Sequence, residues 1–112
     1  MAEVIIVKYL EDEINDKFKG ESIKIFELMK SLTDDPKKGK EIGCVGSIVI
    51  KEIKYKNYRF YFITDGYKVK FLKTEELTDL VIRFVRMSTK KDQQKVIDEI
   101  KYILRKLGSE GF

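Results

Sequence analysis

The chain has no histidine and no tryptophan, and it has only one proline and one cysteine, Cys44, among its 112 residues. Without histidine, the nucleophile–histidine pairs of the usual serine and cysteine hydrolases are excluded. One cysteine and no histidine also leave too few ligands for a transition metal, so we expect no metal and no cofactor. A single cysteine excludes an internal disulfide, which is typical of proteins from a reducing cytoplasm.

Long hydrophobic runs are absent as well. No stretch of the chain approaches the ~20 apolar residues that a membrane-spanning helix needs. The apolar run that follows Met1, Ala2 and Glu3 is too short and too acidic for a signal peptide. We therefore expect a soluble, cytoplasmic protein with no membrane association.

Charged residues are abundant, and the hydrophobic share of 43% is enough for a single domain spanning residues 1–112 to bury its own core. Lys and Glu are frequent whereas Asn and Gln are rare, a composition typical of thermophilic proteins. The net charge of +4 is unevenly distributed. Residues 1–35 carry five cations against nine acids, while residues 36–59 carry seven against two. This asymmetry predicts either a face that attracts an anionic partner or a charge-rich thermophilic surface.

The first third of the chain predicts a strand followed by helix. Glu3–Leu10 has the β-branched apolar centre of a short buried strand, and apolar residues then recur at helical spacing from Glu11 to Thr33. Gly20 interrupts this spacing, so the segment forms either two helices in a hairpin or one kinked helix. The Gly-containing basic segment Pro36–Gly46 predicts a loop.

The remainder predicts a β-meander closed by a helix. Four segments have the composition or alternation of strands: Ser47–Lys56, Tyr58–Thr64, Tyr67–Leu72 and Leu80–Met87. Asp65-Gly66 predicts a tight hairpin between the second and third of them. A strong helical stripe runs from Val96 to Leu107, with Thr89 and Asp92 spaced as a capping box and Gly108 as the stop. The chain is thus predicted to be an α+β domain with an N-terminal strand, a helical hairpin, an antiparallel β-meander and a C-terminal helix packed on the sheet.

The segment KEIKYKNYRFYF mixes cations with aromatic residues. Cations neutralise phosphates and rings stack on unpaired bases, so this mixture is suited to a polyanion, although it also suits an ordinary solvated strand. Tyr58, Phe60 and Phe62 share one strand face and are predicted to belong to the core, whereas Tyr55 and Tyr61 are expected to be more exposed.

Arg59 lies between aromatic residues on a strand predicted to be central in the sheet. A buried unpaired charge is costly, so Arg59 either pairs with Glu52 across the hairpin or contacts a phosphate. Arg83 and Arg86 have an odd spacing, which predicts opposite faces of their strand and lets at most one of them join Arg59. Arg86, which lies nearer the strand end, is the better candidate.

Three segments resemble the RelE/ParE toxin superfamily. DPKKGKEIG (Asp35–Gly43) resembles the family segment after the second helix, IKEIKYKNYRFYFI (Ile50–Ile63) its central hairpin, and RFVRMSTKKDQQKVI (Arg83–Ile97) its last strand and the following helix. The resemblance covers most of the chain. It implies the order β-α-α-β-β-β-α and, for many members, metal-independent cleavage of messenger RNA on the ribosome.

The resemblance also implies roles for individual residues. Arg59 falls on the position of a phosphate-binding arginine, Lys54 on a basic position of the preceding strand, and Lys90 or Lys91 on the late basic position after the last strand. Arg86, chosen from its place on its strand, completes the predicted catalytic set with Arg59 and Lys54. Glu52 stands where the nucleases often have lysine, and the C-terminal tyrosine or histidine of the nucleases has no equivalent, so the catalytic set is incomplete. Further lysines are candidates for salt-dependent binding of RNA phosphates: Lys37, Lys38, Lys40, Lys51, Lys56, Lys90 and Lys91.

Three functions remain open from the sequence. The first is a toxin of a toxin–antitoxin system that acts on messenger RNA at the ribosome and is neutralised by an antitoxin protein. The second is a non-catalytic binding module on the same fold, which includes gyrase-inhibitor-like proteins. The third is an unrelated small α+β protein that acts through its dimer.

Overall fold

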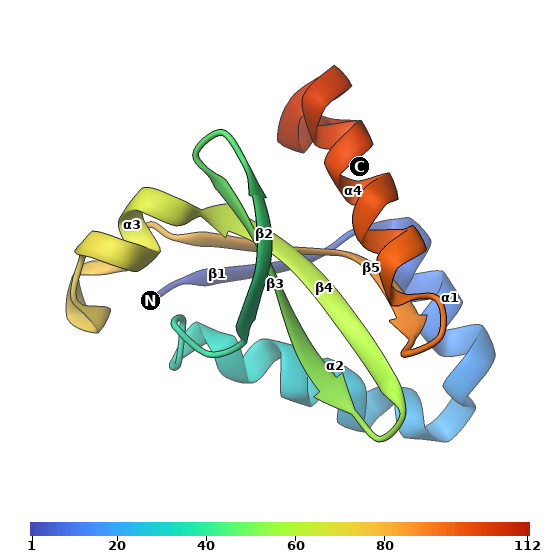
Figure 1. Cartoon of the computed structure of the whole chain (residues 1–112). Helices are drawn as coiled ribbons and strands as arrows, with labels where there is room; N and C mark the ends of the chain where they lie inside the picture. The colour runs from blue at the N-terminus through green and yellow to red at the C-terminus, as the bar shows by residue number, and fades with distance from the viewer.

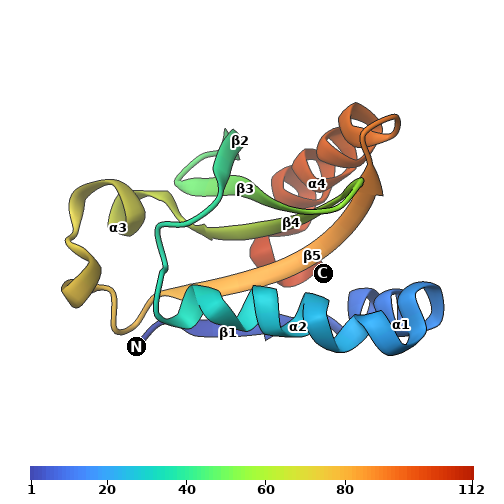
Figure 2. The ribbon, with the colours of Figure 1, turned by 90° about the horizontal axis from the view of Figure 1, so that it is seen from below.

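A five-stranded mixed sheet lies between two helical layers (Figures 1 and 2). The computed structural model describes all 112 residues. The helices and strands are β1 (Glu3–Ile6), α1 (Lys8–Phe18), α2 (Ser22–Lys30), β2 (Lys40–Val45), β3 (Ile48–Tyr55), β4 (Tyr58–Asp65), α3 (Gly66–Phe71), β5 (Val81–Thr89) and α4 (Gln93–Leu107). Four short 3-10 turns complete the chain: η1 (Lys19–Glu21), η2 (Ser31–Thr33), η3 (Thr74–Glu76) and η4 (Gly108–Gly111).

The strands follow one another in the order β1-β5-β4-β3-β2. β1 pairs with β5 in parallel, whereas the three other pairs are antiparallel. The predicted α+β class, with an N-terminal strand, two helices and a closing helix on the sheet, is confirmed. No helix in the structure has the length and apolar character to cross a membrane.

Each face of the sheet has its own core. Figure 2 shows α1 and α2 on one side and α4 on the other. On the first side, Leu10, Ile14 and Ile25 of the helices pack against Phe60 and Phe84 of the sheet, and all five are fully buried. On the second side, the apolar stripe of α4 packs against β3, β4 and β5 through residues Ile97, Ile100, Leu104, Ile50, Tyr61, Ile63 and Val85. The sheet is therefore covered on both faces over its middle.

The helical segment breaks where it was predicted to break. α1 ends at Phe18, Lys19 adopts a positive φ of 51°, and the η1 turn that contains Gly20 leads into α2. Two helices therefore form instead of one kinked helix. The predicted strand at Glu3–Leu10 is too long, because it ends at Ile6 and α1 begins at Lys8.

Two predictions in the middle of the chain were wrong. Pro36–Gly46 was predicted to be a loop, but its second half forms the outer strand β2. Tyr67–Leu72 was predicted to be a strand after an Asp65-Gly66 hairpin, but it forms the short helix α3. Asp65 is the N-cap of this helix, because its carboxylate accepts a hydrogen bond from the backbone N–H of Lys68 at 3.1 Å. The same Asp-Gly pair that favours a tight turn here begins a helix.

Three smaller predictions have mixed outcomes. The capping box was wrong, because Thr89 still belongs to β5 and Asp92 occupies the N-cap of α4 without a side-chain hydrogen bond. Gly108 ends α4 with a φ of 70°, as predicted for a C-terminal stop. Tyr61 was expected to be exposed but is completely buried under α4.

Candidate functional site

Seven polar side chains occupy adjoining positions on the α4-facing side of the sheet, under and beside the first two turns of α4. The strand register places them in two neighbouring rows across β2, β3, β4 and β5. The first row is Lys40, Glu52, Tyr61 and Arg86, and the second is Lys54, Arg59 and Ser88. We call these seven residues the polar patch. It contains all three predicted catalytic residues, which the register thus brings together.

The polar patch is continuous with the apolar core below α4. Side chains two positions apart share a face of a strand, so Ile50 precedes Glu52 on β3 and Ile63 follows Tyr61 on β4. Both isoleucines pack under α4. The sequence therefore changes from apolar to polar along each strand where the cover of the helix ends.

A β-bulge in β5 changes the predicted orientation of its arginines. Arg83 pairs with Ile63 and Arg86 pairs with Tyr61, so the register shifts by one residue between them. An extra residue in one strand returns the next side chain to the same face. Arg83 and Arg86 consequently lie on one face, and the prediction of opposite faces was wrong.

Arg59 forms a buried ion pair with Glu52. The Nε atom of Arg59 lies 3.5 Å from Oε2 of Glu52, and the two side chains are only 11% and 3% exposed. The same carboxylate oxygen accepts a hydrogen bond from the side-chain amide of Gln93, at the start of α4, at 3.4 Å. Nε of Arg59 itself is buried and has no hydrogen-bond partner within the protein. Of the two readings of Arg59, the pair with Glu52 is the one that the structure contains.

Tyr61 and Ser88 form a second buried polar pair. Their hydroxyl oxygens are 2.6 Å apart, and the hydroxyl of Ser88 also lies 2.9 Å from the carbonyl oxygen of Thr89, to which it donates. Burial raises the pKa of the Tyr61 hydroxyl, an effect that its hydrogen bond with Ser88 partly offsets. The hydroxyl of Tyr61 is therefore protonated at neutral pH.

The guanidinium group of Arg86 is also bonded within the protein. Its Nε lies 3.4 Å from Oε1 of Glu99 on α4, and its Nη1 donates to the carbonyl oxygen of Val85 at 2.7 Å. The guanidinium carbon lies 5.3 Å from the ring centre of Tyr9 and 5.1 Å from that of Phe112. These contacts fix the side chain between α1, α4 and the last residue of the chain.

Three of the predicted lysines surround a hollow beside the polar patch. Lys38 and Lys40 flank Gly39 at the start of β2, and Lys54 lies on β3. Glu52, Ile53 and Leu28 of α2 line the rest of the hollow, which therefore lies at the edge of the sheet. The hollow has a volume of about 340 Å³. None of these three lysines forms a salt bridge or donates a side-chain hydrogen bond. We call Lys38, Lys40 and Lys54 with Gly39 the lysine hollow, because their charges are available to a ligand.

Gly39 is required at this place. Its φ of 105° is a conformation that residues with a Cβ rarely adopt, and an added Cβ would lie 2.9 Å from a ring carbon of Phe62. The chain thus passes close to the core between Lys38 and Lys40.

The other candidate lysines are placed differently. Only 5% of Lys51 is exposed, and its ammonium group donates to the carbonyl oxygen of Lys37 at 2.9 Å. Burial lowers the pKa of Lys51. Lys56 pairs with Glu21 at 2.6 Å. The side chain of Lys37 and those of Lys90 and Lys91, in the turn before α4, are exposed. The structure thus removes Lys51 and Lys56 from the set of available cations.

Sequence reasoning missed Tyr61, Ser88 and Gln93 as members of this region. Tyr61 lies two residues from Arg59 on the same strand, so alternation alone would have placed the two on one face. Gln93 had no such signal, because its contact with Glu52 depends on how α4 crosses the sheet.

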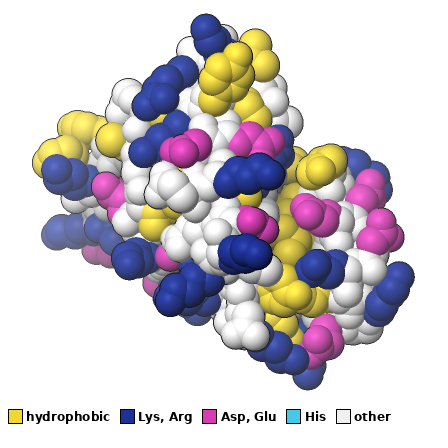
Figure 3. All heavy atoms as spheres, turned by 45° about the vertical axis from the view of Figure 1, so that its right-hand side comes forward, with side chains coloured by type: hydrophobic (Ala, Val, Ile, Leu, Met, Phe, Trp, Pro, Cys, Tyr) yellow, Lys and Arg dark blue, Asp and Glu magenta, His cyan; other side chains and the backbone are white.

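Comparison with protein-family models, characterised proteins and solved structures finds no match for this chain. The assignment of a function therefore depends on the chemistry of the site. On the face shown in Figure 3, Lys and Arg side chains are dispersed with acidic side chains among them. This face has no continuous basic surface, so an anionic partner would be attracted here by local clusters of cations.

Proposed function

We propose that this chain is an RNA-binding protein with a RelE/ParE-like fold, and that it is a binding module without a complete nuclease site. The observation that carries the proposal is the contrast between its cations. Lys38, Lys40 and Lys54 line one hollow and form no ion pair, whereas Arg59 and Arg86 are each paired with a carboxylate; Glu52, the one acid that also lines the hollow, is the partner of Arg59. Unpaired lysines around a hollow attract phosphates without regard to sequence.

The element order supports the choice of fold. A strand, two helices, an antiparallel strand series and a closing helix follow one another as the resemblance implies, with β2 and the short helix α3 as departures in detail. The polar patch contains Arg59, Lys54 and Arg86, the three residues predicted to form the catalytic set. An antitoxin protein and the ribosome are, in this proposal, the partners that such a fold implies.

The chemistry of RNA cleavage explains why we favour binding. When the 2′-hydroxyl attacks the adjacent phosphate, negative charge develops on the phosphoryl oxygens, and nearby cations must be free to stabilise it. Glu52 and Glu99 neutralise the two arginines, and Tyr61 is buried and protonated. Lys54 is the one predicted catalytic residue whose charge is uncommitted.

A metal-independent endoribonuclease is the second candidate, and one observation favours it. Nε of Arg59 is buried without a hydrogen-bond partner, and its separation of 3.5 Å from Glu52 is long for a charge-assisted hydrogen bond. A phosphate bound beside Lys54, which is the neighbour of Arg59 across the hairpin, would compete with Glu52 for this guanidinium.

Salt-dependent binding to RNA tests the proposal. Fluorescence anisotropy with a labelled single-stranded RNA is measured at several salt concentrations for the wild type and for a Lys38→Gln/Lys40→Gln/Lys54→Gln triple variant. Each lost phosphate contact on a single strand lowers the salt slope by about 0.7, so we expect the triple variant to lose about two in slope along with most of its affinity.

A matched control replaces three other exposed lysines, as Lys19→Gln/Lys70→Gln/Lys106→Gln, with the same change in net charge. Equal losses in the two triple variants would show that only net charge matters and would refute a site at the lysine hollow. Translating ribosomes decide between the two candidates. New 5′ ends on the message that disappear in an Arg59→Ala variant would establish the nuclease, whereas their absence supports the binding module.

A further inference from the structure

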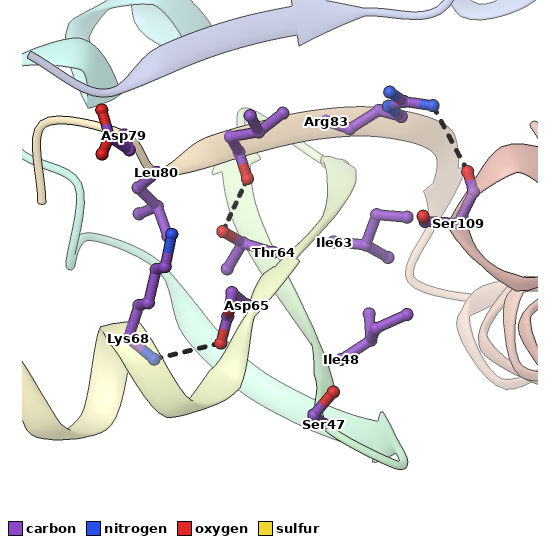
Figure 4. Close-up of a pocket in the computed structure, with 11 residues that line it drawn as sticks. Ser47, Ile48, Ile63, Thr64, Asp65, Lys68, Asp79, Leu80, Arg83 and Ser109 are labelled. Atoms are coloured by element: carbon purple, nitrogen blue, oxygen red, sulfur yellow. Dashed lines mark hydrogen bonds between the residues drawn. The ribbon is translucent and has the colours of Figure 1, made fainter.

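A cleft of about 380 Å³ opens at the other end of the α4-facing side of the sheet. It lies between α3 and the η4 turn, and Figure 4 shows its lining side chains. Ile48 and Ile63 supply its apolar side, while Thr64, Lys68, Arg83 and Ser109 supply polar groups. Clefts of roughly 300–1,000 Å³ with an apolar wall and a few polar groups are the usual form of small-molecule sites.

The cleft exists because two strands separate. β4 and β5 pair as far as Ile63 and Arg83. Beyond this point β4 continues along β3, whereas the beginning of β5 pairs with β1 on its other side. The hydroxyl of Thr64 donates to the carbonyl oxygen of Val81 at 2.7 Å, and this side-chain bond takes the place of the backbone ladder. The opening is thus built into the sheet and does not depend on an exposed loop.

Arg83 is the cation that this cleft leaves available. Its Nη1 donates to the carbonyl oxygen of Ser109 at 3.3 Å, and it forms no salt bridge. A guanidinium group has five N–H donors in a planar fork, so most of the donors of Arg83 have no partner in the protein. By contrast, Arg59 and Arg86 on the same face of the sheet are each paired with a carboxylate.

The opposite end of the cleft has no excess of positive charge. Figure 4 shows Lys68, Asp65 and Asp79 on the side away from Arg83. The carboxylate of Asp65 also caps α3. Two acids therefore outweigh the one lysine there, and attraction for an anion is concentrated at Arg83, next to the apolar wall of Ile48 and Ile63.

We propose that this cleft binds a small organic anion, with a carboxylate or phosphate group on the guanidinium of Arg83 and a short apolar chain over Ile48 and Ile63. A bidentate contact from arginine suits both anionic groups. This site is separate from the lysine hollow. The cleft is proposed to bind a small molecule, whereas the lysine hollow is proposed to bind a polyanion.

Chemical-shift titration of the ¹⁵N-labelled protein tests the proposal with four probes: butyrate, butyl phosphate, butylammonium and inorganic phosphate. We expect butyrate or butyl phosphate to shift the amide signals of Ile48, Thr64, Arg83 and Ser109 in a saturable manner. Butylammonium has the same chain with the opposite charge and should leave them unchanged. The anion with the lower dissociation constant, butyrate or butyl phosphate, identifies the preferred anionic group. Inorganic phosphate should bind more weakly than butyl phosphate, and the difference measures the contribution of the butyl chain.

Variants of the arginine complete the test. Loss of a charge-assisted pair of hydrogen bonds should weaken binding of the butyl anion by about tenfold or more in Arg83→Gln. Arg83→Lys keeps the charge without the fork and should fall between that variant and the wild type. Arg105→Gln, which changes an exposed arginine outside the cleft, should bind as the wild type does. The proposal is overturned if neither anion gives saturable shifts, if butylammonium binds equally well, or if Arg83→Gln and Arg83→Lys both bind like the wild type.

Discussion

The ion pair between Arg59 and Glu52 makes a quantitative prediction about stability. At 3.5 Å, with an effective dielectric constant of about 20, the gross attraction between two unit charges is about 5 kcal/mol. Much of this offsets the desolvation of two side chains that are only 11% and 3% exposed. Glu52→Gln keeps the shape of the side chain but leaves the buried guanidinium unpaired. Because removal of one partner of a buried pair is costly, we expect a loss of about 3 kcal/mol in the free energy of unfolding.

A double-mutant cycle isolates the pair itself. Arg59→Leu should also be destabilising, since it leaves the Glu52 carboxylate buried with only Gln93 as a polar neighbour. The double variant removes both charges and should recover a coupling energy of at least about 2 kcal/mol relative to the sum of the single variants. Urea unfolding at pH 7, followed by far-ultraviolet circular dichroism, measures all four free energies.

Glu99→Gln provides the control for this cycle. It removes the carboxylate partner of Arg86, but the side chain of Glu99 is 50% exposed, so we expect a cost below about 1 kcal/mol. The reasoning is refuted if Glu52→Gln costs less than this control, or if the effects of the two single variants simply add. Arg59 would then be uncommitted, and the nuclease interpretation would regain its central residue.

Three further predictions concern the same sheet. Tyr61→Phe should cost about 1 kcal/mol at pH 7. The pKa of Tyr61 is raised in the folded protein, so as the pH rises the unfolded state loses this proton first and the free energy of unfolding of the wild type should fall above pH 10.0. Urea unfolding at several pH values should show that the variant lacks this part of the fall. Lys51→Met should be at least as stable as the wild type at pH 7, because the lowered pKa of Lys51 reports a cost of burying its charge. Wild-type stability should rise as the pH rises through this lowered pKa toward 10.5, and that rise should be absent from the variant. Gly39→Ala should cost about 2 kcal/mol or more, since φ is 105° and a ring carbon lies 2.9 Å from the added Cβ, whereas Gly20→Ala, which has open space, should stay within about 0.5 kcal/mol in the same assay.

Long periodic segments made much of the fold predictable from the sequence. The apolar stripe of α4 and the hairpin of β3 and β4 were predicted within a few residues of their observed ends. A six-residue segment carries less information. In α3, Tyr67 and Phe71 alternate as they would in a strand, but they are also four residues apart, and in the helix their ring centres lie 4.9 Å apart. The hydrogen bond from the backbone of Lys68 to the Asp65 carboxylate caps the helix and favours it over a strand.

The edge strand β2 was missed for a related reason. Its sequence, KEIGCV, contains two charges and a glycine, which disfavour a strand in isolation. Pairing with β3 supplies the backbone hydrogen bonds that the composition does not suggest. Charged residues and a register shift are also what an outer strand uses to avoid further pairing.

The candidate site was predictable in its members but not in its chemistry. Arg59, Lys54 and Arg86 share one end of one sheet face. Whether each charge is available depends on partners distant in the sequence. Glu99 on α4 pairs with Arg86, and the carbonyl oxygen of Lys37 accepts a hydrogen bond from the ammonium group of Lys51. Such contacts follow from the crossing of elements and have no local signal.

One geometric cause explains both proposed sites. α4 packs over the apolar middle of this face through Ile97, Ile100 and Leu104. Its first residue, Gln93, donates to Glu52 at one end of the face, and Arg83 donates to Ser109 in the η4 turn after its C-terminus at the other end. Positions that are apolar below the helix become polar at each end.

The two ends differ in how their charges are balanced. At one end, Glu52 and Glu99 neutralise the arginines, so lysines that project around the open hollow carry the available charge. An open arrangement of flexible cations suits an extended polyanion. At the other end, Arg83 has no acidic partner and lies beside an apolar wall in a cleft. That combination selects a small ligand by its shape as well as by the sign of its charge. Because α4 separates the two ends, a ligand at one of them need not exclude a ligand at the other.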